Sequence, residues 1–225
     1  MVGGEGCQVG LVDERDLDYC LGLEANTQSL IDGGQLYDAW QSWNQEFGYF
    51  LNKMGCQYYY NIAICDFDPA EDNYEDFCNW ESTREALHVG NLPFPNPGDV
   101  YFSMINVFME TGMHDIEFVL NAGYKTLIYD GNFDIICNHS GILDMIADMQ
   151  WDAKADYDKV TTKLLFNHFQ AARSVYRYGD EVVGYLKKAK NLDLLVVRNA
   201  GHMVPLSQPP WAQQMIEDFT SGNLQ

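Results

Sequence analysis

Apolar residues recur at steps of three and four positions over residues 17–51. This spacing places them on one face of an α-helix, in which 3.6 residues make one turn. The pattern is interrupted at Gly33 and Gly34, and paired glycines favour a break in a helix. We therefore predict two helices in this segment. The apolar positions that carry the pattern are Leu21, Leu23, Leu30, Ile31, Leu36, Trp40, Trp43, Phe47 and Phe50.

Two later segments have the pattern of buried strands. Residues 125–129 form a short apolar and β-branched run between Gly123 and Gly131, and residues 192–197 form a second run of the same kind. Continuous apolar runs of this length are typical of parallel strands that are covered on both faces. We predict that these two segments belong to one sheet.

The residues around these runs predict the rest of the sheet and its helices. Residues 140–149 have helical spacing, and residues 174–178 and 182–186 flank a Gly-Asp turn typical of a hairpin. A last helix is predicted over residues 211–219, after two prolines. Alternating strands and helices indicate an α/β fold.

The middle of the chain is predicted to be helical on both sides of a loop. Residues 81–89 have a short helical pattern that ends near Gly90. Residues 92–98 contain three prolines and a glycine, which predicts a loop. Residues 107–122 resume helical spacing and stop at Gly123, a common signal for the end of a helix.

The charge of the chain argues against two classes of partner. With 33 acidic and 13 basic residues, the formal net charge is −20. Such a chain repels nucleic acid and anionic lipid. No apolar run approaches the length of a membrane span, so we expect neither a nucleic-acid partner nor a membrane partner.

The six cysteines point to disulfides and therefore to the secretory route. The first residues contain neither a basic region nor an apolar stretch like those of a signal peptide, so we expect the native N-terminus to lie upstream. Zinc is the alternative role for the cysteines. No CxxC pair is present, however, and the histidines are scattered, so the sequence predicts no metal site. The five histidines are His88, His114, His139, His168 and His202.

Two side chains follow the predicted parallel strands in positions suited to catalysis. Asp134 comes shortly after residues 125–129, and His202 comes shortly after residues 192–197. In open α/β sheets, reactive groups lie just past the carboxyl ends of the strands. An aspartate followed in the chain by a histidine is the second half of the Ser, Asp, His order of an α/β hydrolase.

The surrounding motifs resemble those of the serine carboxypeptidase family. Residues 129–138 (YDGNFDIICN) resemble its aspartate motif, and residues 201–205 (GHMVP) with Gln208 and Pro209 resemble its histidine motif. Residues 10–13 and 86–89 are similar to further family segments, and the cysteine-bounded segment 56–65 is most similar to the vitellogenic-like branch. The resemblance implies the C-terminal portion of an α/β-hydrolase sheet with a helical lid insertion.

This resemblance also implies a division of the chain. Residues 1–16 would connect to an N-terminal half, residues 17–80 would form the helical lid with disulfide loops, and residues 81–225 would form the C-terminal part of the core. The family motif places the catalytic carboxylate at the second of its two aspartates. We therefore expect Asp134 to be the catalytic residue and Asp130 to serve the turn.

Two further residues acquire roles from the resemblance. The family cysteine that matches Cys137 is unpaired and lines the pocket for the C-terminal residue of the substrate. The methionine that follows the histidine, here Met203, lies beside it. We therefore expect both side chains to contact the substrate, which would be the C-terminus of a peptide or protein. The resemblance implies no cofactor.

The chain lacks the nucleophile of this mechanism. A nucleophile elbow has the pattern Gly-x-Ser-x-Gly, and no serine here has a glycine two positions away on either side. The family carries this serine in the N-terminal half, which we expect as the missing partner. The sequence therefore predicts a serine-type carboxypeptidase of the secretory pathway, lysosomal, vacuolar or extracellular. A catalytically inactive binding or interaction protein is the alternative.

Overall fold

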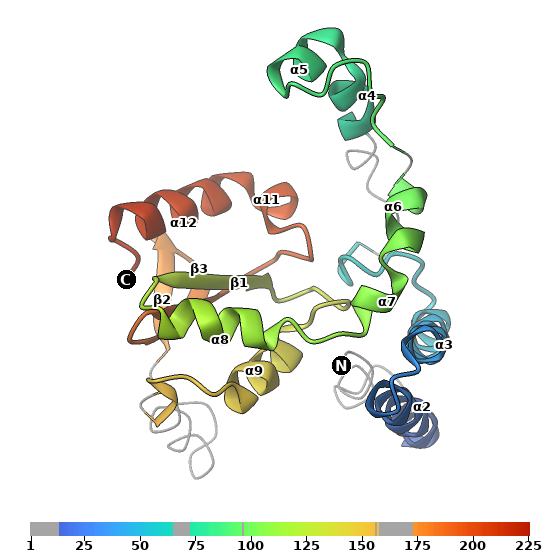
Figure 1. The fold of residues 1–225 in the computed structure, drawn as a ribbon. Coiled ribbons are helices and arrows are strands. Elements are labelled where there is room, and N and C mark those ends of the chain that lie inside the picture. The colour runs from blue at the N-terminus through green and yellow to red at the C-terminus, as the bar shows by residue number, and fades with distance from the viewer. Residues whose placement is uncertain (1–13, 65–72, 96, 156, 158–172) are drawn as a thin grey trace.

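The computed structural model describes residues 14–64, 73–95, 97–155, 157 and 173–225. Several residues singled out in the sequence, among them Cys7, Cys65, His168 and residues 10–13, lie outside these ranges. The helices α2 and α3 come first, and the sheet and its covering helices follow (Figure 1). The elements are α2 (Glu14–Asp32), α3 (Leu36–Met54), α4 (Asn73–Asn79), α5 (Glu81–Ala86), α6 (Pro97–Ser103), α7 (Ile105–Phe108), α8 (Met113–Asn121), β1 (Thr126–Gly131), α9 (His139–Asp148), β2 (Ser174–Tyr178), β3 (Glu181–Ala189), β4 (Leu192–Val197), α11 (Val204–Ser207) and α12 (Pro209–Ser221).

The four described strands form one mixed sheet in the order β1, β4, β3, β2. β1 pairs with β4 in parallel, while β4 with β3 and β3 with β2 pair antiparallel. All six residues of β4 are buried, and five of them are apolar, which explains the largely apolar run that predicted this strand. Within the described residues, β1 has a strand partner on one side only, and its first residues are half-buried.

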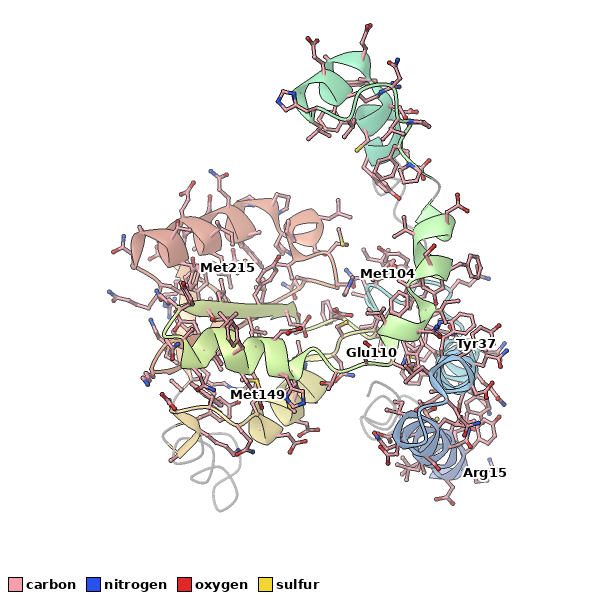
Figure 2. All side chains as sticks on the ribbon, viewed as in Figure 1. Arg15, Tyr37, Met104, Glu110, Met149 and Met215 are labelled. Atoms are coloured by element: carbon pink, nitrogen blue, oxygen red, sulfur yellow. The ribbon has the colours of Figure 1, made fainter. Side chains whose placement is uncertain are left out.

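Helices cover both faces of this sheet, as expected for an α/β fold (Figure 1). On one face, side chains of α12 such as Met215 pack on β3 and β4. On the other face, Leu120 of α8 and Ile146 of α9 form a second core with Leu192 and Leu194 of β4. Figure 2 shows Met215 beneath α12 and Met149 on the opposite side of the sheet.

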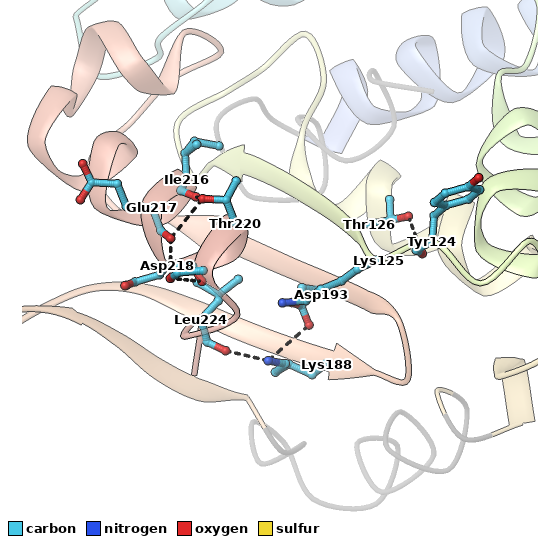
Figure 3. A network of polar contacts seen from close by, with 11 residues as sticks. Tyr124, Lys125, Thr126, Lys188, Asp193, Ile216, Glu217, Asp218, Thr220 and Leu224 are labelled. Atoms are coloured by element: carbon cyan, nitrogen blue, oxygen red, sulfur yellow. Dashed lines mark hydrogen bonds and ion pairs between the residues drawn. The ribbon is translucent and has the colours of Figure 1, made fainter.

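A buried carboxylate in β4 pairs with two lysines, one of which also contacts the last residues of the chain. Asp193 in β4 is 1 % exposed, and its carboxylate lies 3.6 Å from the ammonium groups of Lys125 and Lys188. Lys188 also donates a hydrogen bond to the carbonyl of Leu224 at 2.7 Å (Figure 3). A buried carboxylate requires such partners, because desolvation of an unpaired charge is costly.

Helices α2 and α3 form a separate layer beside the sheet. They pack on each other, and Phe47 and Phe50 of α3 join Cys20 of α2 in a core that also contains Ile135, just after β1. This core therefore brings the two predicted helices next to the end of a sheet strand. α4 and α5 extend away from the rest of the molecule (Figure 1). Within the described residues, no helix is both long and apolar enough to cross a membrane.

The structure confirms most of the predicted elements and corrects two. The predicted single helix over residues 107–122 is wrong, because the chain forms α7 and α8 with a break at residues 109–112. The Thr111 hydroxyl accepts a hydrogen bond from the backbone N–H of Met113, which starts α8 there. The predicted loop also ends early, because α6 begins at Pro97, where a proline suits the first turn of a helix.

Candidate active site

The parallel pairing of β1 and β4 brings two loops to the same edge of the sheet. The last pair in the register is Gly131 with Val197, so both strands end together. The loop amides continue the contact, since Asn132 N–H donates to Val197 O at 3.0 Å and Phe133 N–H donates to Ala200 O at 2.8 Å. Asp134 and His202 follow directly in these loops, as the sequence predicted from the strand ends.

Glycine is required at two positions of this junction because the backbones approach closely. A β-carbon at Gly131 would lie 2.2 Å from Ala200 O, and a β-carbon at Gly201 would lie 2.2 Å from Tyr60 O. Both contacts are with backbone atoms, so no side-chain rotation could relieve them. The glycines of the two motifs thus allow the Asp134 loop, the His202 loop and the Tyr60 segment to meet.

Asp134 and His202 form a hydrogen-bonded pair. His202 Nδ1 lies 2.8 Å from Asp134 Oδ2. The other carboxylate oxygen, Oδ1, accepts the backbone N–H groups of Ile136 at 2.9 Å and Cys137 at 3.0 Å. The Asp134 side chain is 1 % exposed, whereas that of His202 is 34 % exposed. The carboxylate is therefore fixed and buried, and the imidazole reaches toward solvent.

Tyr60, in the segment that follows α3, contacts both the backbone and the ring of His202. The backbone N–H of His202 donates to Tyr60 O at 2.7 Å, and the two rings are stacked with centroids 5.1 Å apart. Tyr60 comes after α3, far from His202 in the sequence. The sequence indicated a family resemblance for residues 56–65 but no role for Tyr60 at the site.

The surroundings of His202 favour its protonated form. The hydrogen bond to Asp134, followed by an interaction with Cys137, raises the pKa of His202 to about 10. The largest cause is the carboxylate at Nδ1, which is the contact that supports the imidazolium in a catalytic triad.

Asp130, the other aspartate of the motif, makes no contact of this kind with His202. It is buried, its Oδ1 accepts the N–H of Gly131 at 2.8 Å, and its Oδ2 has no hydrogen-bond partner. Burial, together with the charge of Asp134, raises the pKa of Asp130 to about 8. Asp130 is therefore held protonated at neutral pH, and Asp134 is the aspartate that contacts His202.

Cys137 and Met203, the two residues predicted to contact the substrate, both lie close to the pair of Asp134 and His202. Cys137 is a free, exposed cysteine, and one ligand atom from each of Asp134, Cys137 and His202 lies within 4.8 Å of the others. Met203 is half-exposed and lines a cavity of about 330 Å³. The other residues around this cavity are Tyr58, Tyr60, Asn61, Ala63, Ile64, Phe133, Asn199, Leu206 and Ser207.

The cysteines outside this site differ in state. Cys20 and Cys56 are disulfide-bonded, whereas Cys78 is free. Cys7 and Cys65 lie outside the described residues.

Comparison with known proteins agrees with this geometry. A family model described as serine carboxypeptidase matches residues 20–222. The vitellogenic carboxypeptidase of Aedes aegypti is 32% identical over 179 residues, which cover 78% of this chain and 36% of the relative. A probable serine carboxypeptidase of Homo sapiens is 26% identical over 224 residues, which cover 96% of this chain and 45% of the relative.

A solved structure shows the same fold. The crystal structure of a prohormone-processing carboxypeptidase from Saccharomyces cerevisiae superposes with a TM-score of 0.61 and 19% sequence identity. The match covers 96% of this chain and 50% of that protein. The predicted fold class, part of an α/β hydrolase, is confirmed. The chain spans a third to a half of the length of the relatives that it matches.

Proposed function

The chain belongs to the serine carboxypeptidase family, and we propose that it supplies the aspartate and histidine of a serine-type carboxypeptidase. The observation that carries this proposal is the hydrogen bond of 2.8 Å between His202 Nδ1 and Asp134 Oδ2 at the ends of β4 and β1. Because Asp134 engages Nδ1, Nε2 is the ring nitrogen through which His202 would act on a nucleophile. The substrate class is the C-terminus of peptides and proteins.

The mechanism follows from the orientation of the pair. A serine from the N-terminal half attacks the carbonyl of the last peptide bond, and His202 takes the serine proton at Nε2. Asp134 keeps the imidazole in the correct orientation and stabilises the imidazolium. His202 then returns the proton to the leaving amine, and water hydrolyses the acyl-enzyme by the same route.

The cavity beside His202 supports a role in binding the C-terminal residue of the substrate. Met203, adjacent to His202, lines this cavity of about 330 Å³ together with Tyr58, Tyr60 and Phe133. The lining also contains the polar side chains of Asn61, Asn199 and Ser207, so the cavity suits a side chain with both apolar and polar parts. Cys137 lies on the exposed side of the pair, where it would contact the part of the substrate next to the scissile bond.

We propose that the N-terminal half packs against β1. β1 is the edge strand of the described sheet, and an unpaired edge offers backbone groups to a further strand. In α8, Leu120 is buried against the sheet, whereas Phe118 and Val119 are exposed. This apolar surface, which continues to the exposed Tyr124 before β1, would be covered by the partner.

The secretory route is the proposed location. Disulfides such as those of Cys20 and Cys56 persist in oxidising compartments. The related yeast protein is described as prohormone-processing. Lysosomal, vacuolar and extracellular sites are all compatible with these features.

Complementation tests the proposed function. The chain is co-expressed with the N-terminal half of the vitellogenic relative, and the purified complex is assayed for release of C-terminal residues and for fluorophosphonate labelling. The complex should be active and should be labelled on the N-terminal half, whereas the 225-residue chain alone should show neither property. His202→Ala in the complex should lower turnover by several orders of magnitude, on the scale of losing a triad member.

His114→Ala is the matched control, because His114 is an exposed histidine on α8 and should leave turnover unchanged. A purified complex without turnover would favour the alternative, an inactive interaction protein. Labelling of the isolated chain would show that it contains a nucleophile of its own.

A further inference from the structure

Asp134, Cys137 and His202 also form a set of metal ligands. One carboxylate oxygen, one thiol sulfur and one imidazole nitrogen lie within 4.8 Å of one another. Oxygen, sulfur and nitrogen donors of these residue types are those that zinc takes in proteins. No other group of three such residues comes together in the part of the chain that the structure describes.

The backbone keeps the three ligands close. Asp134 Oδ1 is held by the N–H groups of Ile136 and Cys137, so Oδ2 remains directed at His202. Since the amide of Cys137 is one of these donors, its main chain is fixed beside the carboxylate. The thiol is on the exposed side and can rotate without displacing core residues.

The dimensions and the charge suit a tetrahedral cation. Zn–N and Zn–O bonds of about 2.0 Å and a Zn–S bond of about 2.3 Å place ligand atoms roughly 3.3 to 3.6 Å apart. Rotation of the exposed Cys137 side chain can close a remaining gap of about 1 Å, given these bond lengths. Carboxylate and thiolate together neutralise the two positive charges, and a water molecule can complete the coordination from the solvent side.

We propose that Asp134, Cys137 and His202 bind Zn²⁺. The bound ion occupies Asp134 and His202, the pair that the proposed peptidase reaction needs, and therefore acts as an inhibitor. The binding itself does not depend on the proposed function. Only the inhibitory consequence rests on it.

Titration of the 225-residue chain with Zn²⁺ in a calorimeter and with Co²⁺ in a spectrophotometer tests the site. Co²⁺ should produce a thiolate-to-cobalt charge-transfer band in the wild type. Cys137→Ser should abolish this band and weaken Zn²⁺ binding by more than about 100-fold, since loss of an outer-shell partner alone costs ~10–100-fold. Cys78→Ser removes the other free cysteine among the described residues and should leave the band and the affinity unchanged.

Alkylation of the wild type provides a measurement that needs no variant. Zn²⁺ should slow the reaction of iodoacetamide with Cys137 and leave the reaction of Cys78 unchanged, as followed by mass spectrometry of the peptides. A wild type that binds no Zn²⁺, a Cys137→Ser variant that binds as tightly as the wild type, or equal alkylation with and without Zn²⁺ would each overturn the proposal.

The inhibitory consequence is measured separately on the complex with an N-terminal half. Zn²⁺ should reduce turnover, and a chelator should restore it. Turnover that is unchanged at saturating Zn²⁺ would contradict the proposed role of Asp134 and His202 in catalysis, while the binding data would still stand.

Discussion

Asp130 and Asp134 are four positions apart, yet the structure surrounds their carboxyl groups differently. Asp134 Oδ1 accepts two backbone N–H groups, and its Oδ2 contacts His202. Asp130 has one N–H donor, and its second oxygen is buried without a hydrogen-bond partner. Burial, followed by the charge of Asp134, raises the pKa of Asp130 to about 8, whereas the hydrogen bonds around Asp134 hold its carboxylate beside the histidine.

Substitution of each aspartate in a complete enzyme tests this difference. Asp134→Asn should lower turnover by about 10⁴, because an amide favours the wrong tautomer of the histidine. Asp130→Asn should cost little, because the amide replaces a carboxyl group that is already neutral. Steady-state kinetics on both variants provide the comparison, and a larger loss for Asp130→Asn would show that the carboxylates are assigned in the wrong order.

The stability of the chain should fall as the pH rises. The pKa of Asp130 is raised in the folded state from 3.8 to about 8, so the folded state binds its proton more tightly than the unfolded state. The contribution of Asp130 to the stability of the folded state is therefore fully present below about pH 4. It is lost progressively as the pH rises to about 8. The raised pKa of His202 acts in the same direction, between about pH 6.5 and 10.

Urea unfolding at pH 5, 7 and 9 measures this dependence. Asp130→Asn should flatten the loss between pH 5 and 9, because the variant has no carboxyl group to ionise at this position. A wild type that becomes more stable from pH 5 to 9 would contradict the raised pKa of Asp130. Asp180→Asn, in the exposed turn before β3, serves as the control for a general effect of removing one negative charge.

At the scale of elements, the packing of α2 on α3 contains a buried acid. Glu46 of α3 is 3 % exposed, and its Oε1 has no hydrogen-bond partner. Burial, followed by the charge of Glu24 on α2, raises the pKa of Glu46 to about 7. The contribution of Glu46 to stability is thus present below about pH 4.5 and is lost as the pH rises through 7.

Glu46→Gln should therefore stabilise the protein above pH 7, because the amide is neutral at every pH. A gain on the order of 1–3 kcal/mol is expected at pH 8, given about 1.4 kcal/mol for each unit of pKa difference, and little change is expected at pH 5. Denaturant unfolding at both pH values measures it. Glu75→Gln on the exposed surface of α4 should leave the free energy of unfolding unchanged at both pH values. An equal gain in stability in both variants would indicate an effect of net charge alone.

At the scale of the whole molecule, the sheet has an open side. β1 is its edge strand within the described residues, and large apolar side chains stay exposed on the neighbouring helices. Phe118 on α8 is 75% exposed, and Phe102 on α6 is 68% exposed. Exposed edges and apolar patches of this kind promote association.

The isolated 225-residue chain should therefore self-associate and bind a hydrophobic dye. Size-exclusion chromatography with light scattering, together with dye fluorescence, measures both properties. Addition of the N-terminal half of a relative should reduce the dye signal, because it covers the edge. A compact monomer that binds no dye would show that the sheet is complete as given and that no partner is needed.

The sequence by itself determined the elements that depend on short-range patterns. The largely apolar runs located β1 and β4, the Gly-Asp turn located the hairpin, and the motifs at the strand ends located Asp134 and His202. The pattern failed over residues 107–122, where helical spacing continues through Thr111 and Gly112 but the chain begins a new helix. Periodicity describes which face an apolar residue occupies, and it does not register a local hydrogen bond that restarts the helix.

Only the tertiary structure decided which groups meet. Asp134 and His202 are 68 positions apart and come together because β1 and β4 pair in parallel and end at one edge. The stacking of Tyr60 on His202 and the approach of Cys137 to the same pair depend on close backbone contacts at Gly131 and Gly201. The sequence predicted no metal site because it contains no CxxC pair and its histidines are scattered. Asp134 and Cys137 are three positions apart, and His202 joins them only through the long-range pairing of β1 with β4.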